Sequence, residues 1–185
     1  MLFRSRTAIV PVDAGGRTIR LGLIGVVLDE LKQPWVRYEP PLAAAKAAAQ
    51  SLAGRVDALI AITHLDLEDD ARMAETIPEL DLILGGHNHL NFLIRRGPGF
   101  TPIVKADHNV RSVAVVELAF GAAGRPTVQS RLQVVDDSIP IDPDTDAVVR
   151  KWTATAFDAF RRDGFTPEAR VVMLPEPLDG RESTI

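Results

Sequence analysis

Two apolar runs separated by a helix-forming segment constrain the fold of this chain more than any other feature. The runs span residues 58–64 and 82–84, and both are bounded by turn residues, which is typical of buried strands. Residues 67–77 predict a helix between them, because acidic side chains occupy the first turn, apolar residues share one face and Pro78 marks the end. A strand, helix, strand order predicts neighbouring parallel strands with a right-handed crossover.

Histidines follow both predicted strands. His64 ends the first run, and Gly85-Gly86-His87-Asn88-His89 follows the second. Parallel neighbours lie about 4.8 Å apart and carry their carboxyl ends to one edge of the sheet, where α/β folds bind ligands. Residues i and i+2 of an extended segment point the same way, so His87 and His89 are expected to aim at one point. The two glycines are expected to allow a sharp turn and close approach to a ligand.

Imidazole is a common ligand of zinc-like metals, so the sequence predicts a metal site formed by His64, His87 and His89. The alternative is an α/β small-molecule-binding domain in which these histidines are polar residues of the sheet edge. His108 is expected to be an ordinary hydrogen-bonded histidine. Asp70 is expected to cap or orient the helix near His64 rather than to bind metal.

Composition narrows the function classes. The 185 residues include 46% hydrophobic residues, which suits one moderate domain with a core, and no cysteine, which excludes disulfides and thiolate metal sites. The net charge of −4 argues against a nucleic-acid-binding surface. No apolar run reaches the ~18 residues of a membrane span, and the first residues lack the pattern of a signal peptide.

The rest of the chain predicts further elements. A hairpin is expected from residues 6–13 and 17–27 around Gly15-Gly16, and strands 101–105, 112–119 and 126–135 are expected to form an antiparallel meander. The other expected elements are a helix at 42–53 capped by Gly54, a helix at 146–161 and a short extended piece at 170–174.

Three segments carry a family resemblance. Residues 61–65, 70–74 and 77–89 resemble the calcineurin-like metallophosphoesterases, in particular the branch of 5′-nucleotidases, 2′,3′-cyclic phosphodiesterases and UDP-sugar hydrolases. Residues 105–113 resemble the strand that follows in that branch, and the resemblance covers about residues 7–135. It implies an α/β fold, a metallophosphoesterase-like β-sandwich flanked by helices in αββα layers.

The resemblance also implies a site with two divalent ions, which could be Mn, Zn, Fe or Co, with His64 and His87 on one ion and His89 on the other. The family's Asp-x-His, Gly-Asp and Gly-Asn-His motifs are not found, and residues 1–63 contain no histidine. We therefore identify no catalytic acid or base in this chain. The expected organisation is an incomplete domain: the second half of a catalytic domain at 1–137, a linker with a helix at 138–169, and the start of a C-terminal domain at 170–185.

The function that follows for the intact parent is nucleotide phosphomonoester hydrolysis, with a nucleotide or another small phosphate ester as substrate. The resemblance favours a periplasmic or extracellular location. This chain alone is expected to bind at most one metal weakly and to be inactive. The alternatives are a degenerate, non-catalytic metal-binding or scaffold module, a cyclic phosphodiesterase, or a thiosulfohydrolase relative.

Overall fold

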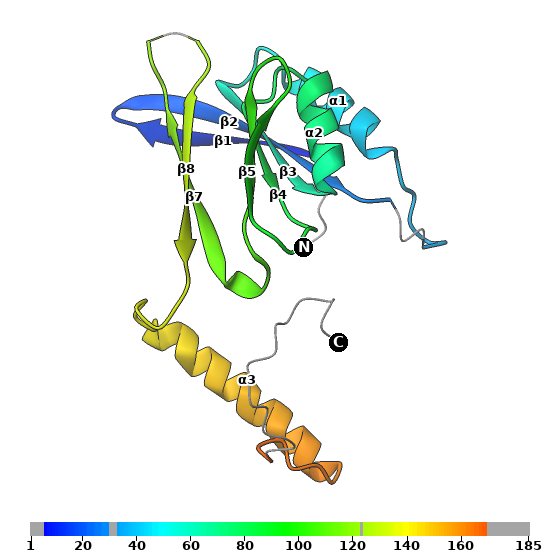
Figure 1. The fold of residues 1–185 in the computed structure, drawn as a ribbon, viewed down its shortest axis with the longest axis vertical. Helices are drawn as coiled ribbons and strands as arrows, with labels where there is room; N and C mark the ends of the chain where they lie inside the picture. The colour runs from blue at the N-terminus through cyan, green and yellow to red at the C-terminus, as the bar shows by residue number, and fades with distance from the viewer. Residues whose placement is uncertain (1–5, 30–32, 123, 170–185) are drawn as a thin grey trace. The chain divides into compact units, whose positions relative to one another are not determined.

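The computed structural model describes residues 6–29, 33–122 and 124–169, and it divides into two units. The first unit ends at Asp136 and contains a six-stranded sheet, a two-stranded sheet, two α-helices and one turn of 3-10 helix at His108–Val110 (Figure 1). The second begins at Asp137 and contains the helix α3 (Pro143–Arg162), whose N-cap Asp142 accepts a hydrogen bond from the Thr145 amide at 2.8 Å. None of the helices in the described part of the chain is long and apolar enough to span a membrane.

The six-stranded sheet has the order β1-β2-β3-β4-β6-β5. Its central strands β2, β3, β4 and β6 run parallel, and the two edge strands pair antiparallel to their neighbours. The strands are β1 (Thr7–Ala14), β2 (Arg17–Val27), β3 (Ala58–His64), β4 (Leu82–Gly85), β5 (Phe92–Arg96) and β6 (Thr101–Lys105). The predicted strand, helix, strand unit is therefore confirmed, with β3 and β4 as parallel neighbours.

The two faces of this sheet are covered differently. Alternate side chains such as Ala61, Ile83 and Ile103 pack against α1 (Pro41–Leu52) and α2 (Leu67–Thr76). The intervening side chains, including Ile60 and Val104, pack against the hairpin of β7 (Ser112–Ala119) and β8 (Thr127–Val134). The result is an α/β sandwich with a helical layer, a mixed sheet and a second sheet, which confirms the predicted fold class (Figure 1).

The strands after β4 differ from the expected meander. β5 was not predicted, and β6 joins the large sheet parallel to β4 instead of pairing with β7. Of the three strands expected in the meander, β7 and β8 alone form an antiparallel pair. The meander prediction was wrong because short spacing between apolar runs indicates hairpins but carries no information about which sheet a strand joins.

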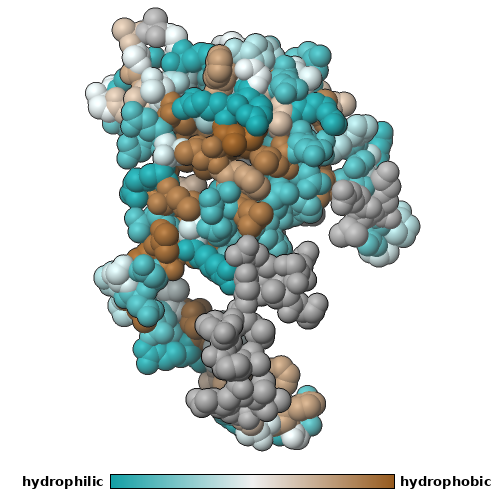
Figure 2. Space-filling view, viewed as in Figure 1, coloured by the Kyte–Doolittle hydropathy of each residue, from teal (hydrophilic) through white to brown (hydrophobic). Residues whose placement is uncertain are grey.

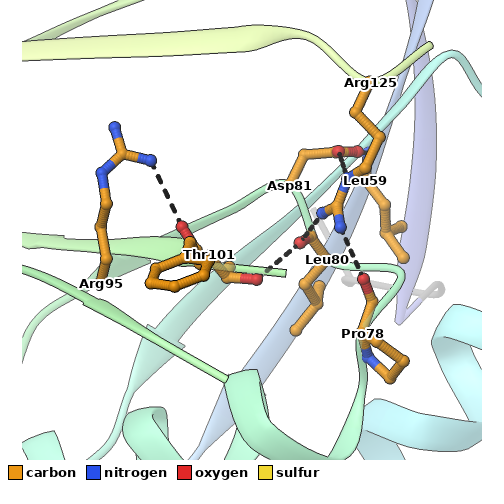
Figure 3. Close-up of polar contacts among 8 residues, drawn as sticks. Leu59, Pro78, Leu80, Asp81, Arg95, Thr101 and Arg125 are labelled. Carbon is orange, nitrogen blue, oxygen red and sulfur yellow. Dashed lines mark hydrogen bonds and ion pairs between the residues drawn. The ribbon is translucent and has the colours of Figure 1, made fainter. Parts of the chain in front are cut away.

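An arginine clamp joins the β7–β8 connection to the amino end of β4 (Figure 3). Arg125 Nε donates to Asp81 Oδ1 at 2.6 Å, and Nη1 donates to the Pro78 carbonyl at 2.8 Å. The other carboxylate oxygen of Asp81 accepts from the buried Leu59 amide at 2.8 Å. The Leu80 carbonyl accepts both from Arg125 and from the Thr101 hydroxyl. This network fixes the second sheet to the end of the large sheet opposite the histidines.

Apolar side chains remain exposed where the hairpin does not reach. Val27, Ile62 and Leu93 lie on the sheet face that packs against β7–β8, and their exposed fractions are 64%, 49% and 59%. Figure 2 shows hydrophobic side chains gathered on the viewed face of the sheet unit. We refer to Val27 and Ile62, which lie on the neighbouring strands β2 and β3, as the apolar strip. Because His64 follows Ile62 at the same strand parity, the strip leads to the predicted site.

Candidate functional site

His64 and His87 form the centre of the candidate site. His64 is the last residue of β3, and His87 follows β4 by two residues. Their imidazole rings meet edge to face, with the ring centroids 5.2 Å apart and the planes at 72°. Asp66, at the start of α2, places Oδ1 3.5 Å from His87 Nε2. His87 thus contacts one imidazole and one carboxylate at the carboxyl edge of the sheet, where the βαβ topology is predicted to place His64 and His87.

The two glycines act through close approach rather than through the turn itself. A Cβ at Gly85 would lie 2.6 Å from Lys105 Cε, and one at Gly86 would lie 3.4 Å from His64 Nδ1. The left-handed conformation falls on His87, with φ of 69°. The expectation that the glycines make the sharp turn was therefore wrong. The groups that approach them closely are side chains of this chain, Lys105 at Gly85 and His64 at Gly86.

The same φ separates His87 from His89. Because β4 ends at Gly85 and His87 is left-handed, the segment is not the extended one from which a common aim of the two rings was expected. His89 instead stacks on His108, with the ring centroids 5.2 Å apart and the planes at 28°. The assignment of His89 as a metal ligand stays a prediction.

His108 is hydrogen-bonded, as expected. Its Nδ1 lies 2.9 Å from the His89 carbonyl oxygen, so Nδ1 carries the proton and donates. The preceding Asp107 accepts from the Ser112 hydroxyl at 2.6 Å and from the Asn91 side chain at 2.9 Å, and these hydrogen bonds lower the pKa of Asp107. The loop that carries His108 is thus tied to the start of β5 and of β7.

Sequence reasoning missed Lys105, which lies directly beneath the histidine loops. Its ammonium is 2.8 Å from Asp70 Oδ2, and both side chains are fully buried. Burial raises the pKa of Asp70, although hydrogen bonds from Lys105 and Thr63 oppose the shift. Asp70 makes an ion pair that joins α2 to the end of β6, and it does not cap the helix, whose N-cap residue is Asp66. The available signal was a charged residue at the end of a mostly apolar strand, on the same face as the buried Ile103.

The donor set matches a divalent ion in kind. Neutral imidazoles and carboxylates are the ligands used by Mn, Zn, Fe and Co. Across the residues that the structure describes, however, no three His, Cys, Asp or Glu side chains form a group that could hold a metal ion. The pair of His64 and His87 would therefore hold an ion only together with ligands from elsewhere.

Solved structures with the same fold include three hydrolases. The 5′-nucleotidase precursor from Thermus thermophilus matches 85% of this chain with a TM-score of 0.65 and 18% identity. The sulfate thiohydrolase SoxB from the same organism matches 83% with a TM-score of 0.71 and 21% identity. The chain has a 5′-nucleotidase-type fold. The NAD nucleotidase NadN from Haemophilus influenzae matches 82% with a TM-score of 0.52 and 15% identity.

The match extends over only part of the 5′-nucleotidase-type proteins. The chain spans 35% of the Thermus 5′-nucleotidase precursor, 29% of SoxB and 33% of NadN. No protein-family model and no curated protein matches the sequence. At these identities the likeness establishes the fold, which confirms the resemblance first noted around the histidines at that level.

Proposed function

We propose that this chain is part of a metal-dependent phosphohydrolase that acts on nucleotides. The observation that carries the proposal is the His64–His87 pair at the carboxyl edge of two neighbouring parallel strands, in a chain with a 5′-nucleotidase-type fold. Three of the solved proteins with this fold are described as hydrolases or nucleotidases. The proposed substrate is a nucleotide or another small phosphate ester, and the proposed location is periplasmic or extracellular.

The roles of the histidines follow from the proposed site. His64 and His87 would hold one divalent ion and His89 a second. When bound, a pair of divalent ions supplies charge stabilisation for the phosphoryl group and an activated water. The protein's part is to hold the imidazoles in place, with Asp66 3.5 Å from His87 Nε2 as a partner that can orient that ring. No residue of this chain is proposed as a general acid or base.

The remaining ligands are proposed to come from polypeptide outside residues 1–185. Two observations support this. The described residues contain no group of three metal-ligating side chains, and the matched proteins are about three times longer than the region they share with this chain. The apolar strip is a further argument, since an additional layer of structure would cover it. In this proposal residues 1–137 are the second half of a catalytic domain, 138–169 a linker, and 170–185, outside the described residues, the start of another domain.

Metal binding and hydrolysis test the proposal together. We expect the 185-residue chain to bind at most one Mn²⁺ per molecule, weakly, by calorimetric titration, and to hydrolyse a generic phosphate ester at the background rate. The His87→Ala variant should lose the Mn²⁺ binding, whereas His108→Ala should keep it. Unaltered Mn²⁺ binding by His87→Ala would contradict the proposed ligand set.

A second candidate is a thiosulfohydrolase. The observation in its favour is that SoxB gives a TM-score of 0.71, against 0.65 for the 5′-nucleotidase precursor. Hydrolysis of a thiosulfate ester in preference to a phosphate ester, by the polypeptide that contains this chain and its missing ligands, would favour this candidate. A polypeptide that binds metal but hydrolyses neither ester would favour a non-catalytic module.

A further inference from the structure

Lys105 joins the segments that carry the candidate metal ligands. It is the last residue of β6, and its side chain is fully buried on the helical side of the sheet. Its ammonium donates to the Leu65 carbonyl at 2.7 Å, next to His64. It also donates to the Gly86 carbonyl at 3.0 Å and to Asn88 Oδ1 at 2.7 Å, which are the residues on either side of His87.

A single ammonium is thus surrounded by oxygens from three segments. Three oxygens accept from the three N–H donors of the lysine, and Asp70 Oδ2, at 2.8 Å, adds an ion pair. The Asn88 amide continues the network, because its Nδ2 donates to Asp66 Oδ1 at 3.2 Å. That same oxygen is 3.5 Å from His87 Nε2, so the chain of contacts runs from the lysine to the imidazole.

Stability alone does not account for this arrangement. Taking an ammonium and a carboxylate out of water is unfavourable, and well-packed apolar residues of similar volume are often as stable or more stable. The loop instead carries two features that need support. Gly85 packs directly against Lys105 Cε and Asp70, and His87 is held at φ of 69°, which is uncommon for a residue with a Cβ.

We propose that Lys105 is a positioning residue that fixes the His64 and His87 rings relative to each other. It does so by holding the backbone after β3 and the backbone on both sides of His87 to one buried ammonium, which Asp70 neutralises. The consequence for metal affinity rests on the proposed function, whereas the consequence for ring geometry does not.

The test uses the full 185-residue chain and the variants Lys105→Met and Lys46→Met. Methionine keeps the length of the side chain but removes every donor, and Lys46 is an exposed lysine of α1 that serves as the control. The first readout is NMR: the ring resonances of His64 and His87, and hydrogen exchange at the Gly86 amide, which donates to the Thr63 carbonyl at 2.8 Å. The second readout is titration with Mn²⁺ alone.

In Lys105→Met we expect both rings to shift and exchange at Gly86 to accelerate about tenfold or more, while amides in β2 and α1 change little. Any measurable Mn²⁺ affinity should fall about 10- to 100-fold, as for other groups that orient metal ligands. Lys46→Met should behave like the unaltered chain. Unchanged ring resonances and unchanged exchange at Gly86 in a folded Lys105→Met variant would overturn the proposal.

Asn88→Ala provides the answer if Lys105→Met does not fold. It removes one contact of the ammonium and should shift the His87 ring while leaving His64 in place; an unshifted His87 ring would overturn the proposal. If neither the unaltered chain nor a variant binds Mn²⁺, the metal readout is lost, but the ring resonances still decide whether Lys105 positions the histidines. The proposed function is contradicted separately, by Mn²⁺ binding that His87→Ala leaves unaltered.

Discussion

Replacing Arg125 with methionine should loosen the attachment of the β7–β8 hairpin. The change removes the hydrogen bonds to Asp81 and to the Pro78 carbonyl, at 2.6 and 2.8 Å, and the bond to the Leu80 carbonyl. Buried hydrogen bonds to charged groups contribute about 1.5–3 kcal/mol. The Arg125 side chain is 46% exposed, so solvent screening reduces this figure, and we expect a loss of about 1–2 kcal/mol in the free energy of unfolding.

Asp81→Ala should be more destabilising than Arg125→Met. The Asp81 side chain is only 8% exposed, and its other oxygen accepts from the buried Leu59 amide, so both bonds are lost together. We expect a loss of about 2–4 kcal/mol, since a buried donor left without its side-chain acceptor adds about 1–3 kcal/mol.

Urea unfolding followed by circular dichroism measures both losses, with Arg131→Met as the control. Arg131 lies on β8 and donates to the side chain of Gln133 at the exposed surface, so its loss should stay within about 0.5 kcal/mol. An Arg125→Met variant with the stability of Arg131→Met would show that the clamp does not hold the two sheets together. An Arg125→Met variant less stable than Asp81→Ala would contradict the expected order of the two losses.

Three further perturbations follow from the structure. Hydrogen bonds from Arg20 lower the pKa of Asp57 to about 2 in the folded chain, against about 3.9 in the unfolded chain. The stabilisation from this carboxylate is therefore complete above about pH 3.9 and is lost as the pH falls toward 2. Unfolding midpoints measured between pH 5 and 2.5 should show this dependence, and the Asp57→Asn variant should lack the part that comes from Asp57. Gly85→Ala should destabilise the chain strongly, because the added methyl group would lie 2.6 Å from Cε of the buried Lys105. Gly25→Ala is the control, since no atom lies near its added methyl group, and it should leave the thermal midpoint unchanged. Equal thermal midpoints for the two variants would contradict the packing argument. Ile62→Thr, which makes the apolar strip more polar, should reduce the binding of a hydrophobic dye and aggregation without lowering the unfolding midpoint. Undiminished aggregation would show that the chain does not aggregate through the strip.

The βαβ part of the fold was predictable because its signals are local. Continuous apolar runs are what strands covered on both faces require, and β3 was predicted with its observed bounds. β5 was not, since only three of its five residues are apolar and it lies at the sheet edge. The order of the strands after β4 depends on pairing across the sheet, which short-range patterns do not specify.

The candidate site was predictable in part for the same reason. The meeting of His64 and His87 follows from parallel strands that share an edge, which is a consequence of topology. The left-handed conformation of His87 and the stacking of His89 on His108 have no signal in the spacing of the residues. The role of Lys105 depends on contacts with Leu65, 40 positions away, and no spacing rule connects the two.

The packing of Gly85 on Lys105 has an evolutionary consequence. Because a side chain at position 85 would occupy the space of the lysine carbons and of the Asp70 carboxylate, the three positions form one steric unit. We expect relatives that replace Gly85 with a larger residue to carry a shorter one at position 105, and relatives that lose the lysine to lose the aspartate as well. An alignment in which positions 70, 85 and 105 vary independently would show that each can change without compensation by the others.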